Sequence, residues 1–225
     1  MVRLVLFDID GTLIRTGGAG VKAFALTAEH DFGLPDGTQR MSFAGRTDTS
    51  LVRELLTAHG RPTDPATIIR FLDAYVFRLD ECLRTHEGRV CPGVQEFIGA
   101  LHRLNPPPLL GLQTGNIRLG AEIKLRHYGL WQHFAVGGFG DDDEDRNRLV
   151  AVGRARGERL LGRALAGDEV LVVGDTPADV RCGRAIGAKV LAVATGGASP
   201  EALRQSQPDW LVPDLTHAAA GDVCG

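Results

Sequence analysis

The sequence predicts an α/β protein built on a parallel β-sheet with helices on both faces. Short apolar runs that end in polar turns recur along the chain, and segments of helical periodicity lie between them. Apolar runs without polar alternation are typical of strands that are buried on both sides. Strands of this kind that alternate with helices favour parallel crossover connections.

Five strands are expected, each a short apolar run: residues 4–7, 109–113, 170–173, 189–193 and 210–212. Helical periodicity fills the intervals between them at 94–104, 117–129, 146–165 and 177–186. The pairs Gly137-Gly138 and Gly196-Gly197 are interpreted as turns, because neither completes a nucleotide-binding pattern.

The segment 16–90 departs from this alternation. It contains no convincing strand, and its helical patterns lie near 20–32, 49–59 and 65–86. Glycines stand at both of its ends, and glycine permits the backbone conformations that a hinge needs. One interpretation is a helical cap inserted after the first strand on two hinge-like linkers. The other is that these helices pack onto the sheet within a single domain.

The composition is that of an ordinary globular protein that acts on a small molecule. The net charge is −3, from 25 Lys and Arg against 28 Asp and Glu, so we expect neither a nucleic-acid nor a membrane partner. No apolar stretch reaches the ~18 residues of a membrane helix. The four cysteines form no Cys-x-x-Cys pair, which indicates reduced thiols and a cytoplasmic location. No pattern indicates an oligomeric state.

Polar clusters follow three of the expected strands: Asp8 and Asp10, Thr114 to Asn116, and Asp175 with Asp179. The carboxyl ends of parallel strands lie at one edge of a sheet, where ligands bind in α/β proteins. We therefore expect these three separated segments to form one site.

Several carboxylates in one crevice indicate a metal ion. At ~4 Å, each pair of unit charges costs about 4 kcal/mol at an effective dielectric constant of 20. A divalent cation relieves this repulsion, and oxygen ligands favour Mg²⁺. The expected ligands are the carboxylates of Asp8 and Asp175 and the backbone carbonyl of Asp10. Asp179 lies one helical turn after Asp175 and would hold a metal-bound water.

The three clusters resemble the motifs of the haloacid dehalogenase superfamily. They read Asp8-x-Asp10-Gly11-Thr12, Thr114-Gly115-Asn116 and Gly174-Asp175-x-x-x-Asp179. Their order and spacing are similar to those of the phosphoglycolate-phosphatase-like branch, and the resemblance covers nearly the whole chain. It implies a Rossmann-like core of residues 1–15 and 91–225 and an α-helical, C1-type cap of residues 16–90.

The resemblance also implies an activity, the magnesium-dependent hydrolysis of a small phosphate monoester such as phosphoglycolate. Asp8 would be the nucleophile that forms an aspartyl-phosphate, and Asp10 the general acid and base. Thr114 and backbone N–H groups around Gly115 would hold phosphoryl oxygens. Asn116 is a candidate for substrate binding, although it could instead cap the helix that it precedes.

Two further groups have competing interpretations. Arg46 lies beside a glycine in the expected cap, where it would contact a second charge on the substrate or form a surface salt bridge. The acidic run 141–145 is interpreted as a solvated loop and helix start, with a second metal site as the alternative.

The cation that balances the phosphoryl group is the point at which the chain departs from the family pattern. Many relatives place it in a Lys-Pro pair, and this chain has none. Lys124 is the preferred candidate, because it lies on an apolar helical stripe where a lysine needs a partner. Arg146, near the usual place of the Lys-Pro pair, is the alternative. A Lys124 that only extends along the helix edge is a third possibility.

Other functions remain in competition with hydrolysis. A phosphosugar mutase would keep both Asp8 and Asp10 but would transfer phosphate without releasing it. A phosphoacceptor signalling domain also uses an aspartate on a parallel α/β sheet, but Asp10 would make its phosphoaspartate too labile. An inactive scaffold would gain nothing from crowded carboxylates.

Overall fold

The computed structural model describes residues 1–225 and contains a six-stranded sheet with the order β5-β4-β1-β6-β7-β8. Every neighbouring pair of these strands is parallel, which confirms the predicted fold class. The strands are β1 (Leu4–Phe7), β4 (Leu109–Gln113), β5 (Val136–Gly138), β6 (Val170–Gly174), β7 (Lys189–Val193) and β8 (Trp210–Val212).

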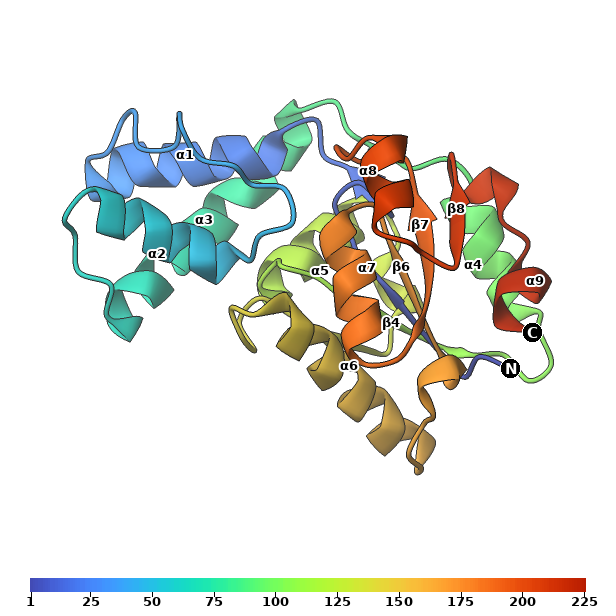
Figure 1. Ribbon diagram of the computed structural model, residues 1–225. Helices are drawn as coiled ribbons and strands as arrows, with labels where there is room; N and C mark the ends of the chain where they lie inside the picture. Colours follow the sequence, from blue (N-terminus) through green and yellow to red (C-terminus); the bar gives the residue numbers. More distant parts are fainter.

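Helices cover both faces of this sheet (Figure 1). They are α4 (Val94–His102), α5 (Arg118–His127), α6 (Arg146–Leu161), α7 (Pro177–Ala185), α8 (Pro200–Gln205) and α9 (Ala220–Cys224). Side chains of β1 alternate between the two layers: Val5 and Phe7 pack with α4, α5 and α9, whereas Leu4 and Leu6 pack with α6, α7 and α8. The central strand is therefore buried on both sides, as its uninterrupted apolar sequence predicts. No helix has the length and apolar character required to span a bilayer.

The chain between β1 and α4 forms a group of helices beside the sheet, here called the helical insert (residues 16–90; Figure 1). It contains α1 (Ala19–Phe32), α2 (Asp48–Ala58) and α3 (Pro65–Thr85), close to the ranges that periodicity predicts. These helices share a hydrophobic cluster of their own, in which the rings of Phe24 and Phe71 lie 4.7 Å apart. The insert thus has its own core, which also includes Ile117 of the sheet domain and packs against Ile123 and Tyr128.

The two connections to the insert run side by side. Strand β2 (Ile14–Arg15) pairs antiparallel with β3 (Arg89–Val90), a pairing that the sequence analysis did not anticipate. Gly17 and Gly18 follow β2 with φ values of 63° and 91°, which only glycine adopts without strain. A side chain at Gly17 would overlap the carbonyl oxygen of Glu87 in the returning segment. The hinge-like glycines therefore permit a close approach between the two connections.

One prediction of a turn was wrong. Gly137 and Gly138 belong to the edge strand β5 and pair with Leu112 and Gln113 of β4. A Cβ on Gly138 would overlap the carbonyl oxygen of Leu149 in α6, so the strand uses glycine to let this helix approach. Close helix packing explains Gly138, whereas a Cβ on Gly137 would lie 2.7 Å from the ring of Phe139. Gly196 and Gly197 do lie in the turn that follows β7.

Candidate active site

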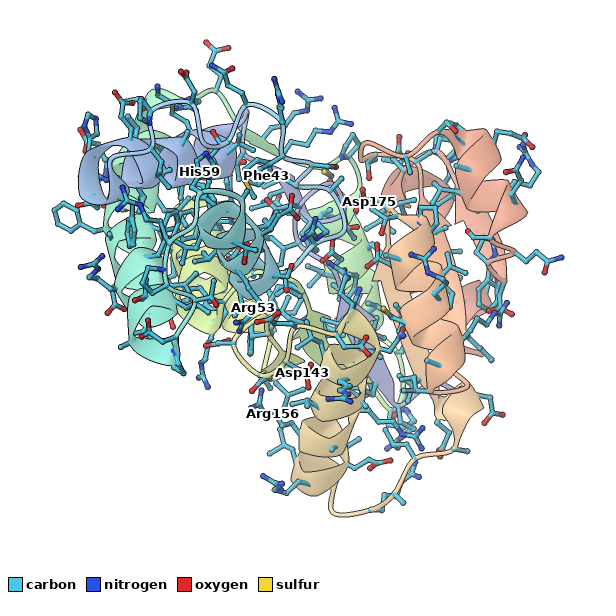
Figure 2. All side chains as sticks on the ribbon, turned by 60° about the vertical axis from the view of Figure 1, so that its left-hand side comes forward. Phe43, Arg53, His59, Asp143, Arg156 and Asp175 are labelled. Atoms are coloured by element: carbon cyan, nitrogen blue, oxygen red, sulfur yellow. The ribbon has the colours of Figure 1, made fainter.

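The carboxyl ends of β1, β4 and β6 meet at a cavity of about 590 Å³ between the sheet edge and the helical insert. Core residues that the sequence singled out line it: Asp8, Asp10, Thr114, Gly115, Asn116, Lys124, Arg146 and Asp175. The insert contributes Arg46 and several apolar side chains. Phe43 of the insert and Asp175 of the core, both labelled in Figure 2, line the same cavity. The three motifs therefore converge as the strand pattern predicts.

Asp8, Asp175 and Asp179 form a group of buried carboxylates whose nearest oxygen atoms all lie within 4.8 Å of one another. Burial, followed by the charge of Asp179, raises the pKa of Asp8 well above its ordinary value. The same two causes raise the pKa of Asp175 to about 7. A divalent cation would remove both penalties, and an all-oxygen donor set suits such an ion. The group has the composition of a metal site. The carboxylate of Asp10 does not belong to this group. The backbone carbonyl of Asp10 as a metal ligand stays a prediction.

Asp179 is held from several sides and is fully buried. It occupies the first turn of α7, where Thr176 donates to its Oδ2 through both N (2.9 Å) and Oγ1 (2.6 Å). Nε2 of Gln113 donates to Oδ1 at 2.9 Å. Arg146 adds an ion pair, with Nη2 2.6 Å from Asp179 Oδ1 and 3.4 Å from Asp8 Oδ1. Arg146 thus offsets part of the negative charge of the group, and Asp179 is no surface carboxylate.

Asp10, Asn116 and Lys124 form a second polar network on the side of the cavity toward the insert. Nζ of Lys124 lies 2.7 and 2.9 Å from the two carboxylate oxygens of Asp10 and 2.6 Å from Oδ1 of Asn116. Nδ2 of Asn116 donates to Asp10 Oδ2 at 2.7 Å and to Thr114 Oγ1 at 2.8 Å. The Lys124 side chain is 5% exposed, so it does not simply extend along the helix edge.

Asn116 corrects one of the interpretations above. The N-cap position of α5 is Ile117, and the Asn116 side chain does not cap this helix. Its amide is instead shared among Asp10, Thr114 and Lys124. An amide supplies both a donor and an acceptor, which is what a position between a carboxylate and an ammonium group requires.

The two basic candidates occupy different places in the site. Arg146 pairs with Asp8 and Asp179, whereas Lys124 pairs with Asp10. The sequence presented them as alternatives for one role, and the structure brings both to the cavity. Which of them contacts the phosphoryl group stays a prediction.

The sequence analysis assigned no role to Thr12 or Gln113. Oγ1 of Thr12 donates to Asp175 Oδ1 at 2.9 Å, and Gln113 holds Asp179. Gly11 lies between the two aspartate-bearing segments with φ 94°, and a Cβ there would be 2.6 Å from Asp175 Oδ2. A polar residue at the end of an otherwise apolar strand was the available signal for Gln113.

The helical insert contacts the loop that follows β4 through residues 46–49. The backbone N of Asp48 donates to the carbonyl of Gly115 at 2.8 Å, and Asp48 Oδ2 accepts from the N–H of Ile117 at 2.9 Å. A Cβ on Gly115 would overlap the carbonyl oxygen of Arg46. The Arg46 guanidinium lines the cavity and pairs with Glu54 at 2.7 Å, so its contact with substrate stays a prediction.

Residues 141–145 behave as a solvated loop and helix start. Each acidic side chain has a separate partner: Arg118 N for Asp141, Arg156 for Asp142, Arg148 for Asp143, Arg53 for Glu144 and Asn147 N for Asp145. Asp145 is the N-cap of α6. Figure 2 shows Arg53 of the insert close to this loop, next to Asp143. The run does not gather its carboxylates as the group at Asp8 does.

Asp48→Asn is expected to change how stability depends on pH. Burial raises the pKa of Asp48 to about 6, while Lys124 and the N–H of Ile117 oppose the shift. Asp10 and Asp141 add to it. The pKa of Asp48 in the folded state exceeds the ordinary value of 3.8. The stability that its preferential protonation in the folded state provides is therefore fully present below pH ~4 and is lost as the pH rises through about 6. The loss corresponds to about 3 kcal/mol.

The measurement is urea unfolding of the wild type and the variant between pH 4.5 and 7.5. The asparagine side chain keeps an oxygen that can accept from the backbone N–H of Ile117, but it cannot ionise. The variant should therefore gain stability relative to the wild type as the pH rises. Asp73→Asn, at an exposed position of the insert, is the matched control. A stability difference between the Asp48 variant and the wild type that does not vary with pH would contradict this assignment.

Comparison with known proteins agrees with the geometry of the site. The chain matches the model of the haloacid dehalogenase-like hydrolases over residues 5–193, and it belongs to this family.

Individual relatives carry phosphatase names. A protein of Chromobacterium violaceum named phosphoglycolate phosphatase is 31% identical over 208 residues, which are 90% of this chain and 89% of that protein. A protein of Dickeya dadantii named "Probable phosphatase IndB" is 29% identical, with 96% of this chain and 92% of that protein covered. Among solved structures, CbbY from Rhodobacter sphaeroides in complex with phosphate superposes with a TM-score of 0.74 at 17% identity, over 96% of both chains.

Proposed function

We propose that the protein is a magnesium-dependent phosphatase that hydrolyses a small phosphate monoester through an aspartyl-phosphate on Asp8. One observation carries this proposal. The buried carboxylates of Asp8, Asp175 and Asp179 lie together, and Asp8 and Asp175 line the same cavity as Asp10. The phosphatase names of the relatives add support. Four free, buried cysteines fit a protein that works on metabolites in the cytoplasm.

In the first step, a carboxylate oxygen of Asp8 attacks phosphorus, and the bond between phosphorus and the ester oxygen breaks. The proton of Asp10 passes to the departing oxygen, so that the alcohol leaves neutral. In the second step, water attacks the phosphorus of the aspartyl-phosphate and gives a proton to Asp10, and the bond between phosphorus and the Asp8 oxygen breaks. Inorganic phosphate leaves, and both aspartates return to their starting states.

Asp8 and Asp175 would hold the magnesium ion, with Asp179 on a metal-bound water. When bound, the ion supplies positive charge that offsets the carboxylates and the phosphoryl oxygens. Thr114 and the backbone around Gly115 would bind phosphoryl oxygens.

Arg146 and Lys124 would have different roles in the reaction. Arg146 is 3.4 Å from Asp8 and would stabilise charge on the transferring phosphoryl group. Lys124 and Asn116 both bind the carboxylate of Asp10 and would orient it toward the leaving oxygen. The helical insert, as a cap, would exclude water from the reaction.

The first test is an assay of purified protein with p-nitrophenyl phosphate. We expect release of inorganic phosphate with Mg²⁺, loss of activity with EDTA, and recovery when Mg²⁺ is restored. Mg²⁺ should also raise the melting temperature of metal-free protein, because it binds only the folded carboxylate group. Full activity in EDTA would contradict the metal assignment. If phosphate appeared on a second alcohol instead of in solution, the mutase hypothesis would replace hydrolysis.

A further inference from the structure

The helical insert gives the cavity an apolar wall opposite the core carboxylates. Five of its apolar or aromatic side chains form this wall, here called the leaving-group chamber: Val21, Phe24, Phe43, Leu51 and Tyr75. They come from α1, from the segment before α2, and from α2 and α3. The rings of Phe24 and Phe43 meet edge to face at 5.4 Å. In the proposed reaction, this wall faces the group that leaves with the ester oxygen.

The cavity is larger than a two-carbon acid requires. Its volume of about 590 Å³ falls in the range of sites that enclose whole small molecules. A phosphoryl group held against Asp8 and Thr114 would occupy only one end. The remaining space is lined by the apolar side chains of the chamber together with Arg15, Arg46 and Asp48. Burial of apolar surface against the chamber is favourable.

The charges around the chamber do not favour a second anionic group. Lys124 pairs with Asp10, and Arg46 pairs with Glu54. The insert adds a buried carboxylate, Asp48. Arg15, at the base of the insert, uses its Nε and Nη2 to donate to the carbonyls of Thr195 and Gly196. Each basic side chain that lines the cavity therefore already has a partner within the protein. A substrate carboxylate in the chamber would lose its hydration next to Asp10 and Asp48 and would have to compete with these partners for a cation.

From these observations we infer that the substrate is a phosphate monoester whose leaving alcohol is uncharged and largely apolar, with a group about as large as a phenyl ring. This inference rests on the proposed phosphatase activity and specifies its substrate class. It differs from what the name of the Chromobacterium relative suggests, since glycolate carries a carboxylate and has no apolar group to bury.

The experiment compares three esters with the full chain in Mg²⁺: 2-phenylethyl phosphate, the same ester with a para carboxylate, and 2-phosphoglycolate. The first two have similar leaving oxygens and differ in one charge. We expect the carboxylate to lower kcat/KM by about 10-fold or more and phosphoglycolate to be poorer still. Equal or higher kcat/KM for either carboxylated ester would overturn the inference while leaving the phosphatase intact. No phosphate release from these esters or from p-nitrophenyl phosphate would overturn the phosphatase activity itself, and the inference with it.

Two variants locate the preference in the chamber. Phe43→Ala should lower kcat/KM for 2-phenylethyl phosphate by about 10-fold relative to phosphoglycolate, because it removes apolar contact. Val21→Lys places a cation in the wall at a position that is 44% exposed, and it should shift the preference toward the para-carboxylate ester. Ile69→Lys, at an exposed position of α3 away from the cavity, is the control and should leave the ratios unchanged. Ratios that stay constant in the Phe43 and Val21 variants would exclude the chamber as the source of specificity.

Discussion

Asp8→Asn is expected to reduce the turnover of phosphate esters by at least about 10⁴-fold, the scale on which loss of a catalytic nucleophile acts. Asparagine has nearly the same shape but cannot form an aspartyl-phosphate. The substitution also removes one charge from a group in which burial and the charge of Asp179 raise the pKa of Asp8. The metal-free variant should therefore be at least as stable as the wild type. Steady-state phosphate release and thermal unfolding measure the two effects.

Asp10→Asn is expected to separate the two chemical steps, the phosphorylation of Asp8 and the hydrolysis of the phosphoenzyme. With p-nitrophenyl phosphate, whose leaving group needs little protonation, Asp8 should still be phosphorylated while water is no longer activated. Acid-quenched protein should then contain phosphoenzyme, detectable by mass, which the Asp8 variant lacks. Normal turnover by Asp8→Asn would show that another group attacks phosphorus.

Arg146→Met is expected to lower kcat by about 10²-fold or more, the size of effect seen when one transition-state donor is removed. The guanidinium contacts both Asp8 and Asp179, and its side chain is 11% exposed. Its removal leaves buried carboxylates without a partner, so the variant should also lose stability, by about 3–5 kcal/mol. Arg146→Lys keeps the charge and should recover part of the stability and some activity.

Lys124→Met is the informative comparison for the Arg146 variants. Because Lys124 binds Asp10 rather than Asp8, its loss should act mainly on the steps that move a proton. We expect accumulation of phosphoenzyme from p-nitrophenyl phosphate in the Lys124 variant and none in the Arg146 variants. Stopped-flow measurement of p-nitrophenol release, with or without a burst, distinguishes the two. Identical kinetics in both variants would contradict the proposed division of work.

Much of the fold was accessible from the sequence because buried parallel strands are uninterrupted apolar runs. The bounds of β1 (Leu4–Phe7) and β7 (Lys189–Val193) agree with the predicted ranges. Strand β5 escaped detection because two of its three residues are glycines, of which Gly138 allows α6 to pack closely. The β2–β3 pair is too short for a periodic pattern to appear.

The site residues that directly follow strands were predictable from the sequence, whereas those on helices or in the helical insert were less so. Asp8 and Asp175 were placed by the parallel-sheet rule alone. Asp48 comes from the helical insert, and its position next to Ile117 depends on how two separate cores meet. The partners of Lys124 and Arg146 could not be assigned either. Each lies on a helix whose rotation about its axis is decided by packing, not by local spacing.

The pairing of β2 with β3 has a mechanical consequence for access to the site. Both connections to the insert pass through one short ribbon, so any movement of the insert relative to the sheet would have to bend the chain there. Arg15 fastens that ribbon to the carbonyl of Gly196, and a Cβ on Gly196 would collide with the carboxylate of Asp175. The ribbon is thus anchored to the loop that packs against Asp175, which we propose as a metal ligand. Bending at this ribbon would move the apolar wall and leave the carboxylates in place on the sheet, so a product could depart while the catalytic centre stays assembled.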